Sequence, residues 1–191
     1  MCGWHDLPLS PTGKLQLQAF STEPSEFKPA AVYASSSSRA RTTAEALAAK
    51  WNVQVTTDPD LREINCGALE GMLIKEVKRR FPDAWIRNAS QDDADFAWPG
   101  GETYGKFRER VFRALSRIAR RHPNVCIPVV THTGVIAQAV GALEGLSPAV
   151  WEQHRPATFT ATEVIWSGEA PVQLLSFNVP DWWRGLKPHA E

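Results

Sequence analysis

The sequence predicts a single α/β domain in which a mostly parallel sheet is covered by helices on both faces. Three observations predict it: the length, the alternation of elements and the absence of internal divisions. A chain of 191 residues is long enough for one domain with a sizeable core. Short apolar runs alternate with longer stretches whose apolar residues recur at helical spacing. No repeat or composition break marks a second domain, so we expect a three-layer sandwich spanning residues 1–191.

The first elements follow this alternation. Ser10 and Pro11 suit the N-cap and first position of a helix, which we expect to turn Leu15 and Ala19 toward the core. Residues 30–34 predict a buried strand, and residues 53–57 predict the next one. The four serines between them predict a strand-to-helix turn, because the residues that follow continue at helical spacing: Ala40, Ala44, Leu47 and Trp51.

The middle of the chain predicts loops around one helix. Residues 61–71 have no clean period and indicate an irregular loop. Ile74, Val77 and Phe81 then mark a helix that Pro82 closes. Residues 88–103 are polar and end in a Trp-Pro-Gly-Gly run, so we expect a long loop there. Long loops in compact domains are often lids.

The second half predicts two helices and three strands. Residues 104–118 form a strongly amphipathic pattern whose arginines we expect on a solvated face. Residues 124–131 predict a strand leading into His132, although Pro128 is disfavoured in a central strand. Residues 135–143 continue as a helix. The runs 159–166 and 172–177 predict a hairpin.

Composition excludes several function classes. Lys+Arg and Asp+Glu both number 21, which argues against a nucleic-acid footprint or a polybasic membrane surface. No apolar run approaches the ~18 residues of a membrane span, and no signal peptide is visible. Cys2, Cys66 and Cys126 are widely spaced, so we expect reduced thiols in a cytoplasmic protein. The five histidines and three cysteines have no metal-ligand spacing, and we expect no metal or cofactor.

His132 stands at the most informative turn of the chain. An apolar strand, a His-x-Gly turn and an apolar helix start place its imidazole at the carboxyl end of a strand, beside free helix amides. Such amides favour anions, which indicates a phosphate-like ligand. A lone histidine in a turn is usually structural, so this feature alone does not decide between the two interpretations.

Arg39 and Glu63 add to this pattern. An arginine in the first turn of a helix is unfavourable for the helix dipole unless an anion lies there, and arginine matches phosphate oxygens bidentately. A carboxylate in a glycine-bounded loop can serve as a general acid when burial raises its pKa. Taken singly, each residue is better interpreted as an exposed side chain. Their order along the chain, followed by His-x-Gly, is far more specific.

Five segments in order resemble the histidine phosphatase superfamily, the phosphoglycerate-mutase-like proteins. Residues 3–13 resemble its G-x-x-D-x-P-L-[ST]-x-x-G segment, and residues 38–45 resemble S-R-A-x-x-T-A-E. Residues 61–71 resemble L-x-E-x-x-x-G-x-x-E-G. The last two segments are Pro-Gly-Gly-Glu-Thr at 99–103, similar to P-G-G-E-S, and Thr-His-Thr-Gly at 131–134, similar to S-H-G-G.

The resemblance implies roles for the matching residues. Arg39 would clamp the phosphate, Glu63 would donate the proton to the leaving group, and His132 would stabilise charge on the phosphoryl group. Thr133 stands where the family often has glycine, and its backbone N–H would face the phosphate. The 99–103 segment would contribute Gly100, Gly101 and Glu102 to a substrate lid.

One family motif has no counterpart in this sequence. The family's nucleophile is the histidine of an Arg-His-Gly motif on its first strand, upstream of the segment that here begins at Gly3. No Arg-His-Gly occurs in the chain. The resemblance therefore implies that the first central strand is absent, which would leave strand edges unpaired. We expect either that Met1 is an internal methionine of a longer protein or that the chain is a shortened paralogue without phosphatase activity.

The motifs that are present, together with the missing one, leave three functions open. The first is a phosphomonoesterase or a mutase, for which length favours the smaller phosphatase branch. The second is a non-catalytic protein that binds a phosphorylated ligand, and the third is a structural paralogue with a vestigial pocket. In each case the expected partner is at most a small phosphorylated molecule, with no nucleic acid and no membrane. An unpaired strand edge would also favour a homodimer.

Overall fold

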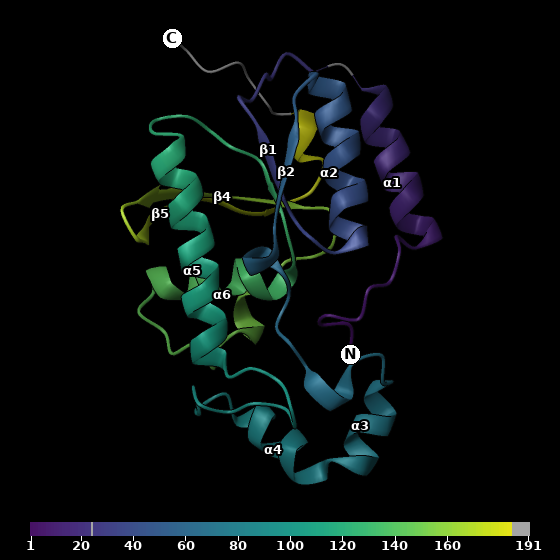
Figure 1. Cartoon of the computed structure of the whole chain (residues 1–191), viewed down its shortest axis with the longest axis vertical. Coiled ribbons are helices and arrows are strands. Elements are labelled where there is room, and N and C mark those ends of the chain that lie inside the picture. Colours follow the sequence, from purple (N-terminus) through teal and green to yellow (C-terminus); the bar gives the residue numbers. More distant parts are fainter. Residues whose placement is uncertain (24, 185–191) are drawn as a thin grey trace.

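The computed structural model describes residues 1–23 and 25–184. Its centre is a three-stranded parallel sheet in the order β2-β1-β3, and a separate antiparallel pair, β4-β5, lies beyond it. Figure 1 shows α1 and α2 together on one side of the strands and α5 on the other, which confirms the predicted α/β class. The strands are β1 (Val32–Ser35), β2 (Val55–Asp58), β3 (Val129–Val130), β4 (Ala161–Ser167) and β5 (Ala170–Val179).

Six α-helices of the described chain cover and extend these strands. Helix α2 packs on β1 and β3, while α5 contacts β4 and α6 contacts β5. The helices α3 and α4 form the end of the molecule farthest from the C-terminal strands (Figure 1). The helices are α1 (Pro11–Thr22), α2 (Ser38–Trp51), α3 (Ile74–Arg80), α4 (Pro82–Ser90), α5 (Tyr104–Arg121) and α6 (Thr133–Leu143).

Helix α1 begins as predicted but buries a different face. The Ser10 hydroxyl accepts a hydrogen bond from the Gly13 amide, as an N-cap should. The expectation that Leu15 and Ala19 face the core is wrong, because both side chains are exposed and Leu17 and Phe20 are buried instead. The reason is aromatic packing: the ring of Phe20 contacts the rings of Trp51, Trp182 and Trp183.

Pro82 opens a helix as well as closing one. The sequence predicted only the end of α3 at this point, but α4 starts at Pro82, which suits the first position of a helix because its missing N–H is not needed there. Helix α4 runs to Ser90, so the loop predicted from residue 88 begins at residue 91. This loop packs against the rest of the molecule, since its Phe96 and Trp98 side chains are buried in the core.

Strand β3 is much shorter than the predicted run of eight residues. Only Val129 and Val130 pair in register with Tyr33 and Ala34 of β1. Pro128 adds one further contact, because its carbonyl accepts from the Tyr33 amide at 2.9 Å. Among the described residues β3 has a strand neighbour on one side only. This position accommodates the proline, which has no N–H to offer a second neighbour.

None of the helices formed by residues 1–23 and 25–184 is long and apolar enough to cross a bilayer.

Candidate active site

Two of the predicted site residues, Arg39 and His132, follow the carboxyl ends of β1 and β3. Because the two strands are parallel, their ends meet at one edge of the sheet. Ser35 ends β1, and Arg39 lies in the first turn of α2, which follows it. His132 is the N-cap of α6, two residues beyond β3. The topology therefore brings together residues almost a hundred positions apart.

His132 is buried and held on both ring nitrogens. Its Nε2 lies 2.8 Å from Ser35 Oγ and 3.2 Å from Ser37 Oγ, and its Nδ1 lies 3.3 Å from Arg39 Nη2. A guanidinium can only donate, so Nδ1 is the acceptor and the ring proton is on Nε2. Burial, followed by the charges of Arg39, Arg110 and Arg62, lowers the pKa of His132 to about 3. The imidazole is therefore neutral at physiological pH.

The Arg39 guanidinium is surrounded by acceptors from the start of the chain. Nη1 donates to the His5 carbonyl at 3.2 Å, and Nη2 donates to the Gly3 carbonyl at 3.1 Å and the Cys2 carbonyl at 3.4 Å. Together with its contact to His132, this arrangement places a full positive charge beside the neutral imidazole. It also shows that the first residues of the chain form one wall of the site.

Glu63 lies against the first turn of α6. Its Oε2 accepts from the Gly134 amide at 2.9 Å, and its Oε1 accepts from the Ile64 amide at 2.9 Å. Burial of the carboxyl group raises its pKa, and the two backbone donors and the arginine charges only partly oppose this. A carboxyl group with a raised pKa is suited to proton donation. Its simpler role is to pair an otherwise free amide at the helix N-terminus.

Gly134 makes the position of Glu63 possible. A Cβ atom added at Gly134 would lie 2.1 Å from Glu63 Oε1, so any larger residue would displace the carboxylate. Thr133, the first residue of α6, directly precedes Gly134. The Thr133 amide is one of the first four of the helix, which have no partner within it.

Arg62 is a cation near the site that no sequence pattern singles out. Its Nε is buried with no hydrogen-bond partner among the described residues. The guanidinium lies over the Trp4 ring, with its Cζ 5.0 Å from the ring centroid. A buried polar nitrogen without a protein partner is unusual in a native protein, and water or an ion commonly satisfies it.

The predicted lid residues pack against the loop that carries Glu63. The Ala68 amide donates to the Pro99 carbonyl at 2.8 Å, and a Cβ at Gly101 would lie 2.5 Å from the Asn65 carbonyl. Gly100 has a positive φ of 72° in the same turn. Glu102 accepts from the Asn65 amide at 2.7 Å. The 99–102 turn and the 65–68 loop are therefore in close backbone contact.

Arg110 corrects the expectation that the α5 arginines form a solvated face. It is buried and forms an ion pair with Glu102. It also donates to the carbonyls of Asp60, Arg62 and Glu63 at 2.7–2.8 Å. These carbonyls face inward from an irregular loop and need donors, which explains why a charged side chain is buried there.

Glu70 fixes the N-terminal segment in the site. Its two carboxylate oxygens accept from the amides of Trp4, His5 and Cys66 at 2.7–2.8 Å. Asp6 accepts from the amide and hydroxyl of Ser38, and these hydrogen bonds lower the pKa of Asp6. The family-like motifs contained Glu70 and Asp6, but only the fold shows that they connect the start of the chain to the site.

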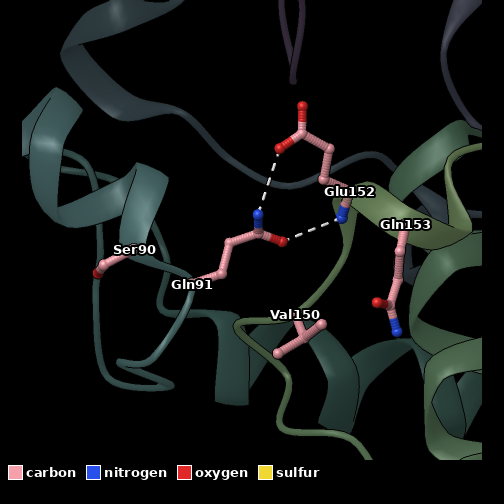
Figure 2. Close-up of a pocket in the computed structure, with 5 residues that line it drawn as sticks. All are labelled: Ser90, Gln91, Val150, Glu152 and Gln153. Carbon is pink, nitrogen blue, oxygen red and sulfur yellow. Dashed lines mark hydrogen bonds between the residues drawn. The ribbon is translucent and has the colours of Figure 1, made fainter.

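Two surface hollows lie elsewhere on the molecule. One, of about 490 Å³, lies between the end of α4 and the short helical turn Glu152–His154 (Figure 2). Gln91 crosses it: its Nε2 donates to the Glu152 carboxylate and its Oε1 accepts from the Trp151 and Glu152 amides. The other hollow runs along α5. Neither is lined by His132.

The fold is that of an α/β protein in which Arg39 and His132 meet at the carboxyl ends of parallel strands. The family model of the histidine phosphatase superfamily (branch 1) matches residues 1–179. The chain belongs to this superfamily, which confirms the resemblance seen in the sequence.

Relatives and solved structures agree with this assignment. The chain is 38% identical over 166 residues to phosphoglycerate mutase-like protein 4 of Arabidopsis thaliana, covering 85% of this chain and 67% of that protein. It is 36% identical over 113 residues to a metal-independent phosphoserine phosphatase of the same plant, covering 58% of this chain and only 47% of that protein.

Among solved structures, YhfR of Bacillus stearothermophilus superposes with a TM-score of 0.82 at 25% identity, covering 94% of this chain and 88% of that one. A mycobacterial glucosyl-3-phosphoglycerate phosphatase gives a TM-score of 0.79 at 25% identity, covering 94% of this chain and 92% of that one. The fold is thus that of histidine phosphatases.

Proposed function

We propose that this chain binds a phosphorylated small molecule between Arg39, Arg62, Glu63 and His132, the site for phosphomonoester hydrolysis in the complete fold. The observation that carries the proposal is the buried Nε of Arg62, which has no partner among the described residues and whose charge lowers the pKa of the same imidazole that Arg39 contacts. Two guanidinium groups at one place suit phosphate oxygens, which they bind with charge-assisted hydrogen bonds. The relatives and structural neighbours, which include phosphoserine and glucosyl-3-phosphoglycerate phosphatases, support the same substrate class.

The residues divide the chemistry between them in this proposal. Arg39 and Arg62 neutralise the phosphoryl oxygens, and His132 stabilises the charge that develops on them. The Thr133 amide faces the phosphate at the start of α6. Glu63, whose pKa is raised by burial, donates the proton to the leaving group. We also propose one domain over residues 1–191, with residues 88–103 as the lid that shapes substrate choice.

We further propose that the 191 residues alone turn over phosphomonoesters weakly or not at all. They contain no Arg-His-Gly, the motif that supplies the nucleophile in the superfamily, and a phosphohistidine route needs that nucleophile. The unpaired side of β3 supports a place for such a strand, next to His132. A strand ending in Arg-His-Gly, joined before Met1, would then restore turnover.

Two finer proposals concern the state of the protein. In the unextended chain, the side of β3 that has no strand neighbour among the described residues would allow a second copy to pair there, giving a homodimer that sedimentation would detect and that an added strand would prevent. The three cysteines are free in the structure, which supports a reducing, cytoplasmic compartment.

Phosphate-dependent melting tests the binding proposal. Inorganic phosphate should raise the melting temperature of the chain above that in chloride of equal ionic strength, because a ligand that binds only the folded state stabilises it. Arg39→Gln and Arg62→Gln should each lose most of this increase. Arg79→Gln, which removes an exposed charge from α3, is the matched control and should keep it. Equal melting temperatures in phosphate and chloride would mean a vestigial pocket and refute the binding proposal.

Hydrolysis of p-nitrophenyl phosphate tests the catalytic proposal. The chain itself should show little turnover, and the extended chain should show turnover that His132→Ala abolishes. An extension ending in Arg-Asn-Gly is the control that supplies the strand without the nucleophile. Robust turnover by the unextended chain, lost on His132→Ala, would overturn the proposal of weak activity while leaving the binding site intact.

A further inference from the structure

Trp4 is the one exposed tryptophan among the eight in the chain, all of which lie in the part that the structure describes. The other seven are buried or half-buried. Trp4 leaves 39% of its surface open to solvent. An exposed indole ring offers a flat apolar surface on which another ring can stack. Its surroundings indicate which ring that is.

Two hydrogen bonds fix Trp4 in place. Its indole Nε1 donates to the Glu63 carbonyl at 2.8 Å, and its backbone amide donates to Glu70 Oε1 at 2.8 Å. Both partners belong to the loop of residues 61–71, which is 59 and 66 residues away from Trp4 at these two points. The ring is therefore held in one orientation, and a ligand that stacks on it finds the surface already ordered.

The neighbouring arginines leave one face of the indole ring open. Arg62 lies over one face, with its Cζ 5.0 Å from the ring centroid. Arg110 approaches the nitrogen edge of the ring, because its Nη2 donates to the same Glu63 carbonyl that accepts from Trp4 Nε1. The exposed surface of Trp4 therefore lies on the face away from Arg62 and on the benzene edge.

The open ring stands between two parts of the site. Trp4 directly follows Gly3, whose carbonyl accepts from Arg39 Nη2 at 3.1 Å. The indole nitrogen is anchored on the backbone of Glu63, the residue whose carboxyl group is the proposed proton donor. Trp4 is thus next to the proposed phosphate clamp along the chain and next to the proposed acid in space.

We propose that Trp4 selects phosphomonoesters with an aromatic leaving group, whose ring stacks on the open indole face. This inference rests on the proposed function, because it needs Glu63 at the leaving-group end of the bound phosphate. The leaving-group oxygen then lies beside the Glu63 carboxyl group, and the ring on that oxygen reaches the indole anchored on the same residue. Two flat rings stack over their faces, whereas a saturated ring touches an indole only through a few hydrogens.

Calorimetric titration with two matched esters tests this proposal. The probes are phenyl phosphate and cyclohexyl phosphate, which carry the same phosphate group on a flat ring and on a puckered ring of similar size. Each is titrated into the whole chain, with inorganic phosphate as the reference and with phosphate release assayed in parallel to account for turnover. The phenyl ester should bind about fivefold more tightly than the cyclohexyl ester, because only the phenyl ring stacks.

Variants at Trp4 separate the ring from its hydrogen bond. The ratio of the two ester affinities is compared within each variant, so a general change in phosphate binding cancels. Trp4→Leu removes the aromatic face and should bring the ratio to one. Trp4→Phe keeps a flat ring but cannot donate to the Glu63 carbonyl, and it should retain most of the preference. Trp85→Leu is the matched control, because Trp85 also carries a cation, with Lys78 Nζ 4.8 Å from its ring centroid, but lies on α4.

The outcomes distinguish this inference from the proposed function. Equal affinities for the two esters, in a chain that binds inorganic phosphate, would overturn the inference alone. A preference for the phenyl ester that persists in Trp4→Leu, or one that disappears in Trp85→Leu, would also overturn it. If none of the three phosphates binds, the proposed phosphate site is refuted and this inference with it.

Discussion

The Gly134 amide donates to Glu63 Oε2 at 2.9 Å, and this hydrogen bond connects the start of α6 to the loop that carries Glu63. His132 is two residues before Gly134, and its position is therefore coupled to that of Glu63. The sequence separates the two partners by 71 residues. Their contact gives the first prediction its basis.

Gly134→Ala should displace the Glu63 carboxylate. The added Cβ would lie 2.1 Å from Oε1, which neither group can tolerate without moving. Overpacking of this kind costs about 1–3 kcal/mol, measurable by urea denaturation. Phosphate-dependent stabilisation should fall in parallel. Gly105→Ala is the control, because the nearest atom to its Cβ would be 3.6 Å away and alanine favours the helix. Equal stability losses in both variants would contradict the explanation.

Glu102→Ala should be among the most destabilising single changes in the chain. It leaves the Arg110 guanidinium buried without its counter-charge, and breaking a buried pair in this way costs about 3–5 kcal/mol. The loop carbonyls that Arg110 binds should become less ordered, which amide hydrogen exchange near Glu63 would reveal. Glu169→Ala, which removes the weak surface pair with Arg120, should change stability by no more than about 1 kcal/mol. A loss below that value for Glu102→Ala would refute the structural role of the pair.

Stability should decrease in acid because of His132. Its pKa is about 3 in the folded chain against 6.5 for the free side chain, so the unfolded state binds more protons between these values. The stability that depends on keeping His132 neutral is complete above pH 6.5. It is lost as the pH falls toward 3, and the free energy of unfolding falls by at most about 1.4 kcal/mol per pH unit. The raised pKa of Glu63 acts in the opposite direction. Subtracting the curve of His132→Gln from that of the natural chain isolates the histidine, and the difference should be flat above pH 6.5.

Labelling rates should distinguish the three cysteines. Burial raises the pKa of Cys66 to about 12 and also raises that of Cys126, while Cys2 is exposed. Since the thiolate is the reactive form, a maleimide at pH 7 should modify Cys2 first. Mass spectrometry of the native chain after brief treatment would show one adduct. Cys2→Ser should suppress it, and rapid modification of Cys66 would contradict the burial described here.

The local motifs were predictable because they depend on short-range geometry. The strand, turn and helix around His132 follow from residues 129–136, and the cap at Ser10 follows from the residues beside it. The face of α1 was not predictable in the same way. Leu15, Leu17, Ala19 and Phe20 permit more than one buried stripe, and contacts with Trp182 and Trp183, far along the chain, select Leu17 and Phe20.

The site was predicted in outline but not in its supporting contacts. Arg39, Glu63 and His132 lie together as their motifs indicated, because each follows a strand end or a shaped loop. Ser35 and Ser37 were interpreted only as part of a turn, yet their hydroxyls hold His132 Nε2. Arg110 carries no local signal, since its role depends on which backbone carbonyls the fold leaves without partners. The position of Arg62 over the Trp4 ring likewise depends on the fold.

The carbonyls on the Arg39 guanidinium have a practical consequence. Cys2 contributes one of them and carries the thiol that is expected to react first. A small environment-sensitive dye on that thiol would be attached to a residue of the site's wall without any mutation. Ligand that competes for Arg39 must change the surroundings of Cys2, so the dye's emission would act as a built-in sensor of occupancy. The first residues of this chain are thus a reporter as well as a wall.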